Sequence, residues 1–120
     1  TRPGASAISF WALMEHLGFN GFLEIVKRCW ENTILLRDLV EDTKGIRFVK
    51  EPTMNILGIQ PEKQTDNSIC KLDNELRKKG WAMGIFRNWN FARAVIMPHI
   101  TQKHIYQFIE DIKEIIHSIY

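Results

Sequence analysis

The stretch FARAVIMPHITQKHIYQFIEDIKEIIHSI, residues 91–119, decides the fold because it joins a strand pattern directly to a helix pattern. Its first seven residues are mostly apolar, and Pro98 ends this strand because proline lacks the N–H group that a sheet ladder uses. Thr101 is a typical helix cap. Seven apolar residues then share one face of a helix of about four turns: Ile105, Phe108, Ile109, Ile112, Ile115, Ile116 and Ile119.

Toward the N-terminus the same two patterns recur. Strands are predicted at residues 46–49, 54–59, 81–86 and 92–97, and residues 87–90 form the turn between the last two. Helices are predicted at residues 5–17, which end at Gly18, at residues 20–42, and from Thr65 or Asp66 to Lys79. This order predicts an α+β fold, with a small, mainly antiparallel four-stranded sheet and helices packed on it.

The first helix differs from the others in its pattern. Its apolar residues go nearly all the way round, which a surface helix of a small monomer would not tolerate. We therefore expect it to pack against a partner on both sides. These residues are Ile8, Phe10, Trp11, Leu13, Met14 and Leu17.

The composition is that of one domain spanning residues 1–120. Of the residues, 45% are hydrophobic and 25% charged, which is typical of a chain that buries a core. The net charge of +2 argues against nucleic acid as the default partner. No apolar run approaches the roughly 18 residues of a membrane span, so we expect no membrane partner. The chain starts at Thr1 without a signal-peptide pattern, and we expect a piece of a longer protein.

Metal, thiol and nucleic-acid chemistry find little support in the sequence. The four histidines lack the spacing of metal ligands, and none forms a helical i,i+4 pair. Cys29 lies on an apolar helix stripe, and neither it nor Cys70 belongs to a CxxC motif, so we expect a reducing, cytoplasmic setting. Basic and aromatic residues interleave between Lys78 and Arg93, but this weak nucleic-acid signal is outweighed by the use of strand aromatics in cores.

Arg93 is the candidate binding residue. Strand alternation places its side chain on the same face as Val95 and Met97, within an apolar segment. A charge there needs a reason. The guanidinium either reaches water at an edge, pairs with a carboxylate of the protein, or binds an anionic ligand through two parallel hydrogen bonds.

Six motifs occur in an order that resembles a known family. The chain is similar to the C-terminal part of group II pyridoxal-phosphate-dependent decarboxylases, above all the archaeal-type L-tyrosine/L-aspartate decarboxylases, with sphingosine-1-phosphate lyases as cousins. The motifs that carry the resemblance cover essentially the whole chain: TRPGA (1–5), WA (11–12), LGFNGF (17–22), EPTMNI (51–56), KGW (79–81) and ARAVIMPHIT (92–101).

The resemblance implies the C-terminal small domain of a fold-type I enzyme that uses pyridoxal 5'-phosphate. Residues 1–42 would form a helical connector to the large domain and residues 43–120 the sheet domain. In the family, the large domain carries the cofactor on a lysine that follows a histidine. None of the nine lysines here does so. By resemblance the chain therefore lacks the Schiff-base lysine, is inactive alone, and belongs to a cytoplasmic homodimer.

The resemblance also implies roles for particular residues. Arg93 falls where the decarboxylases carry an arginine for the α-carboxylate of an amino-acid substrate, L-tyrosine or L-aspartate here, and where the lyases tend to have histidine. Thr1 and Arg2 match a loop near the cofactor. A carbon-carbon lyase of the sphingosine-1-phosphate type remains the alternative, since residues 1–4 and 79–81 are lyase-like. A stand-alone binding module that has lost the chemistry is a third reading.

Overall fold

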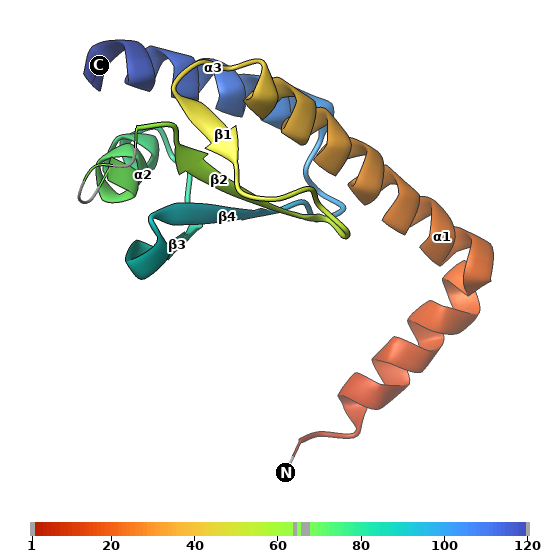
Figure 1. Ribbon diagram of the computed structural model, residues 1–120. Helices are drawn as coiled ribbons and strands as arrows, with labels where there is room; N and C mark the ends of the chain where they lie inside the picture. Colours follow the sequence, from red (N-terminus) through yellow and green to blue (C-terminus); the bar gives the residue numbers. More distant parts are fainter. Residues whose placement is uncertain (1, 64, 66–67, 120) are drawn as a thin grey trace.

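The computed structural model describes residues 2–63, 65 and 68–119, with nothing stated of the Ile119 side chain. The described residues form three α-helices and four strands, in the order α-β-β-α-β-β-α (Figure 1). The predicted cap Asp66 lies outside the described residues, whereas Thr101 caps the last helix as predicted: its hydroxyl accepts from the N–H of His104 at 3.5 Å. The elements are α1 (Ala5–Glu41), β1 (Ile46–Phe48), β2 (Ile56–Pro61), α2 (Ser68–Lys78), β3 (Gly84–Phe86), β4 (Phe91–Val95) and α3 (Gln102–Ile119).

The four strands form one antiparallel sheet in the order β1-β2-β4-β3. The predicted α+β class and the four-stranded antiparallel sheet are confirmed. The central strand β4 pairs with β2 on one side and with β3 on the other, so that Arg93 lies between Gly58 and Gly84. This register follows from period-2 alternation, because a slip of one residue would turn the buried set outward.

All three helices contribute to a core on one face of the sheet. The second half of α1 and α3 lie next to each other, and α2 contacts α3 and the strands (Figure 1). Leu57, Ile59 and Ala92 of the sheet are fully buried beneath them. The helical residues that complete this core include Leu36, Val40, Ile69, Leu72, Leu76, Ile105, Phe108, Ile109, Ile112 and Ile115.

The long helix α1 is two helices joined at a kink. Gly18 has φ 60° and ψ −175° inside it, a conformation that glycine adopts readily and other residues avoid. The predicted break at Gly18 is confirmed. The first buried residue of α1 is Cys29, so the half before the kink extends away from the sheet layer (Figure 1). The radius of gyration is accordingly 17.0 Å, compared with about 14 Å for a compact domain of this length.

Several strand boundaries differ from those predicted, and contacts in the structure bear on two of them. β3 begins at Gly84 instead of residue 81, because Trp81 is held against α3: its Nε1 donates to Asp111 Oδ2 at 2.7 Å, and its ring packs edge-on against Phe108. β2 extends to Pro61, two residues beyond the predicted strand, and Pro61 pairs with Ile46 of the edge strand β1.

The turn between β3 and β4 caps α2 from outside the helix. Asn90 adopts a left-handed conformation, with φ 52°, and its Oδ1 accepts from the backbone N–H of Ile69 at 3.0 Å. Its Nδ2 donates to the Ser68 hydroxyl at 2.8 Å. The cap of α2 is therefore a residue more than twenty positions away, which no local helix rule predicts.

None of the described helices has the length and apolar character needed to cross a bilayer.

Candidate functional site

The face of the sheet opposite the helices carries the candidate site. Alternation places Gly58, Phe91, Arg93 and Val95 on this side, while Ala92 turns into the core. We call it the open face, because Arg93 and Val95 are exposed there within the described chain. A sheet face with apolar strand residues and no covering layer is typical of a surface that meets another part of a larger protein.

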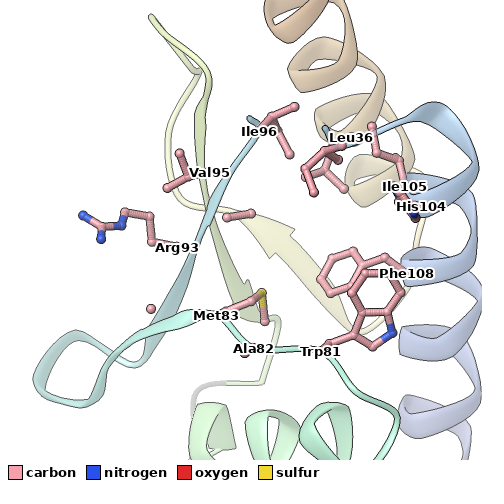
Figure 2. Close-up of a pocket in the computed structure, with 13 residues that line it drawn as sticks. Leu36, Trp81, Ala82, Met83, Arg93, Val95, Ile96, His104, Ile105 and Phe108 are labelled. Carbon is pink, nitrogen blue, oxygen red and sulfur yellow. The ribbon is translucent and has the colours of Figure 1, made fainter. Parts of the chain in front are cut away.

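Arg93 projects from β4 on the open face. Figure 2 shows its side chain leaving the strand on the opposite side from Leu36, Ile105 and Phe108. The guanidinium carbon lies 5.5 Å from the centroid of the Phe86 ring, within cation–π distance. Among the described residues, no carboxylate forms an ion pair with Arg93. Its guanidinium donors are thus available to an anion.

Three aromatic rings form a stack beside Arg93. Phe86 and Phe91 are parallel within 11°, with centroids 4.8 Å apart. Trp89, which lies in the 3-10 turn Arg87–Trp89, stacks 6.1 Å from Phe86 and 6.4 Å from Phe91. The stack fixes the Phe86 ring on which the guanidinium lies.

A cavity of about 250 Å³ lies along β4, mainly on the side of the helices. It opens where residues 81–83 diverge from the sheet, and its walls are mostly apolar (Figure 2). His104 lines it but has a structural partner, since its Nδ1 accepts from the backbone N–H of Thr101 at 3.1 Å. No lysine lines the cavity, and Arg93 is the one arginine among its described walls.

A charged cluster at the C-terminal end of α2 has a structural role. Lys79 Nζ donates to Asp111 Oδ1 at 2.9 Å and also binds Glu114. Hydrogen bonds from Trp81 first, and from Lys79 second, lower the pKa of the Asp111 carboxyl below its ordinary value. Hydrogen bonds to Glu114 and Asp111 raise the pKa of Lys79. These groups attach the end of α2 to α3 on the side of the sheet away from Arg93.

The cysteines and histidines form no reactive centre among the described residues. Cys29 is buried in the core as expected, Cys70 is partly buried, and both are free thiols. No group of three metal-ligating side chains occurs within residues 2–63, 65 and 68–119.

Of the other two residues expected near a cofactor, the structure describes only Arg2, and it does not bring Arg2 to Arg93. Arg2 is exposed ahead of the first half of α1, at the end of the chain far from the sheet (Figure 1). Thr1 lies outside the described residues. Arg2 is not among the residues that line the cavity.

The sequence did not reveal the immediate surroundings of Arg93. Gly84 and Phe86 of the neighbouring strand β3 lie next to Arg93, and both fell inside the longer strand predicted at residues 81–86. An isolated glycine within a strand is a signal of close approach by another group, and this signal was present at Gly84. The arrangement can bind a planar anion, since a guanidinium offers two parallel donors and the surrounding apolar surface weakens competition from water.

The chain has clear sequence relatives. It is 36% identical over 115 residues to an L-aspartate decarboxylase of Thermococcus kodakarensis, which covers 96% of this chain and 28% of that protein. It is 36% identical over 116 residues to a probable L-tyrosine/L-aspartate decarboxylase of Methanocella arvoryzae, covering 97% of this chain and 29% of that protein. The chain thus spans less than a third of the curated relatives it matches. No protein-family model matches it.

Solved structures share the fold at low sequence identity. A sphingosine-1-phosphate lyase of Burkholderia pseudomallei superposes with a TM-score of 0.84 at 18% identity, over 98% of this chain and 26% of the lyase chain. The TDC of Oryza sativa, solved with PLP and tryptamine, superposes with a TM-score of 0.77 at 16% identity, over 91% of this chain and 26% of that chain. The sheet and its helices therefore have the same fold as about a quarter of each of these chains.

Proposed function

We propose that this chain, which is related over 96% of its length to part of the archaeal L-aspartate decarboxylases, is the small domain of a pyridoxal-phosphate-dependent amino-acid decarboxylase. The complete protein would convert L-aspartate or L-tyrosine to the corresponding amine and carbon dioxide. The relatives are named for these substrates. The match covers 28% and 29% of their length, so the rest of such an enzyme lies outside the part matched by this chain. In this proposal the chain alone is inactive.

The observation that carries the proposal is the position of Arg93. A guanidinium that lies on an open sheet face, over an aromatic ring and without an ion-pair partner in the described chain, is suited to a carboxylate brought by another component. A structural arginine would instead pair with a carboxylate of its own fold, as Arg77 does with Asp73 at 2.8 Å. We assign to Arg93 the α-carboxylate of the amino-acid substrate.

The role of Arg93 is orientation. Its planar fork binds a carboxylate in one plane, and so fixes the direction of the bond that breaks when carbon dioxide leaves. Binding the carboxylate much more tightly than the transition state would slow the reaction, because negative charge leaves that group as the bond breaks. An arginine on the open face of the sheet, with one ring beside it, meets this limit better than a deeply buried one.

The described residues do not by themselves form a cofactor site. The cavity along β4 lacks a lysine, and its polar groups other than Arg93 are used within the fold. The cofactor would therefore be held by the large domain, as expected for the family. Pyridoxal phosphate would supply the electron withdrawal, and this chain would supply position and charge for the substrate. Arg2 and Thr1 remain proposed contacts of the cofactor site or of a dimer interface.

The first half of α1 fits a connecting role. Its exposed apolar residues include Ile8, Phe10 and Trp11, each more than 60% exposed. Burial of such side chains is favourable, at roughly 25 cal/mol per Å² of apolar surface. We propose that residues 1–42 connect to the large domain of the same enzyme and that the complete protein is a cytoplasmic homodimer.

Carbon dioxide release by the complete protein tests the proposal. L-aspartate, L-tyrosine and a panel of other amino acids are assayed with added pyridoxal phosphate, in parallel with a phosphorylated long-chain base watched for aldehyde. Decarboxylation of an amino acid is expected. Aldehyde release from the base, without carbon dioxide from any amino acid, would instead assign the lyase reaction.

The Arg93→Ala variant tests the residue assignment. We expect kcat/KM to fall roughly 100-fold or more, since a charged hydrogen-bonding group that orients the reacting bond is lost, while the absorbance of the bound cofactor is unchanged. Arg47→Ala, an arginine of β1, is the matched control and should keep full activity. Activity of Arg93→Ala within threefold of the wild type would remove Arg93 from the proposal.

A further inference from the structure

The guanidinium of Arg93 lies over the place where Gly84 has no side chain. Gly84 is the directly paired residue of β3. A Cβ built on Gly84 would lie 3.6 Å from Nε and 3.6 Å from Nη2 of Arg93, and its three nearest atoms all belong to Arg93. A side chain larger than a methyl group at this position would occupy the volume of the guanidinium.

The backbone does not explain this glycine. Gly18, Gly45 and Gly80 have positive φ and need glycine for that reason, whereas Gly84 is not among the residues with positive φ. Glycine in a strand is unfavourable, because it has no side chain to pack and gains the most freedom on unfolding. Alanine would make only ordinary contacts here, whereas a side chain that extends beyond Cβ would compete with Arg93 for the same space.

Phe86 bounds the guanidinium from a second direction. It lies two residues after Gly84 on the same face of β3, and the Arg93 guanidinium carbon is 5.5 Å from its ring centroid. The ring is itself held by Phe91 and Trp89, so it cannot turn freely. A fixed ring restricts the plane of a guanidinium that lies on it.

We infer that Gly84 and Phe86 are positioning residues, which together form a seat that holds the Arg93 guanidinium in one orientation for the substrate carboxylate. The inference rests on the function proposed above, and adds to it two residues of β3 that act through Arg93. A free arginine side chain has many rotamers, and ordering it at the moment of binding costs affinity. A seat that orders the guanidinium beforehand removes much of that cost.

The Gly84→Val variant of the complete protein tests the seat by steric displacement. Valine is favourable in an edge strand and Gly84 is exposed, so folding should be preserved. We expect kcat/KM to fall roughly 10- to 100-fold, as misplacement of an orienting group does. Gly84→Ala should cost less than Gly84→Val, because its Cβ would make only an ordinary contact. Arg47→Val, which places the same side chain on β1, is the control without effect.

Ligand binding separates positioning from general damage to the structure. The probes are a substrate analogue that keeps the carboxylate but lacks the amino group, and the amine product that lacks the α-carboxylate. These are succinate and β-alanine for an aspartate enzyme, or 3-(4-hydroxyphenyl)propanoate and tyramine for a tyrosine enzyme. In calorimetric titrations, Gly84→Val should weaken the first probe of the pair and leave the second within twofold. A merely structural role would weaken both.

Phe86→Leu tests the ring. Loss of a partly exposed cation–π contact should lower kcat/KM and the affinity for the carboxylate probe by roughly two- to fivefold. Phe86→Tyr keeps the ring face and should restore both values.

The outcomes distinguish this inference from the proposed function. If Arg93→Ala abolishes binding of the carboxylate probe while Gly84→Val and Phe86→Leu leave it unchanged, the seat is wrong and the role of Arg93 stands. If Arg93→Ala leaves binding of that probe unchanged, there is nothing for the seat to position, and both fail. Loss confined to the carboxylate probe in Gly84→Val and Phe86→Leu supports both.

Discussion

The two faces of the sheet differ in how closely side chains pack on them. On the covered face, Leu57, Ile59 and Ala92 are fully buried, and helical side chains pack against them. On the open face, Arg93 has a glycine on the strand to each side, and its guanidinium lies beside the Phe86 ring, which stacks on Phe91. The covered face is built for packing, and the open face leaves room.

Because of this difference, the residues that determine stability and those that bind substrate lie on opposite faces of the same sheet. Adjacent residues of β4, such as Ala92 and Arg93, point to opposite sides and can be changed independently. Substitutions on the covered face should act on the free energy of unfolding, and substitution of Arg93 on the open face should act on substrate binding. Three of the four predictions below test that separation, and the one on Asp111 tests the attachment of α2 to α3.

The largest expected effect is on the covered face. Ile59→Ala should lower the free energy of unfolding by roughly 2–5 kcal/mol, since it removes a fully buried side chain and leaves a cavity. Ile56→Ala, in the same strand but 42% exposed on the open face, is the matched control and should cost less than about 1 kcal/mol. Urea unfolding of both variants makes the measurement. Equal losses would show that the two faces are packed alike.

Arg93→Lys should have the next largest effect, on activity. Lysine keeps the charge but lacks the planar fork, so kcat/KM for the amino acid should fall about 10- to 100-fold, or roughly 1.4–2.7 kcal/mol of transition-state stabilisation. The free energy of unfolding should change by less than about 1 kcal/mol, because the guanidinium is exposed. Steady-state kinetics and urea unfolding test the two halves of this prediction. A large loss of stability with full activity would reverse it.

Asp111→Asn should reduce stability by about 1–2 kcal/mol at neutral pH, because hydrogen bonds to a charged carboxylate are lost. The folded-state pKa of Asp111 is lowered from its ordinary value of 3.8, so its contribution is present above that value and is lost as the pH falls through the lowered folded-state pKa. The difference in melting temperature between wild type and variant should therefore shrink below about pH 4. A constant difference between pH 7 and pH 2 would contradict this.

The smallest effect is expected at Trp89, on the tip of the β3–β4 turn. Trp89→Ala removes one ring of the stack but little buried surface, since Trp89 is 69% exposed. The free energy of unfolding should fall by about 0.5–1 kcal/mol. Thermal melts detect such a change, and a loss above 2 kcal/mol would mean that the open face carries part of the core.

The sequence predicted the elements well where a pattern repeats. The stripe of α3 is confirmed for its six residues from Ile105 to Ile116, all buried or partly buried, while the Ile119 side chain lies outside the described residues. The break at Gly18 followed from glycine and a following polar cap signal, and the placement of Arg93 on the face of Val95 from strand alternation.

The parts that the sequence did not predict depend on contacts between distant residues. The short β3 results from the attachment of Trp81 to Asp111, thirty positions away. The cap of α2 is provided by Asn90, and the room around Arg93 by Gly84 on a neighbouring strand. Strand pairing brings these groups together, and single-sequence periodicity gives the faces of a strand without its neighbours.

The kink at Gly18 has a consequence for how such a protein is made. Residues 29–119 complete their own interior, whereas residues 5–17 contribute nothing to it. During synthesis the apolar first half of α1 would leave the ribosome before the sheet and its helices. It would dock early if the surface that it binds were already folded. Truncation of the chain at Gly18 should thus remove these exposed apolar side chains and leave the sheet and its helices folded.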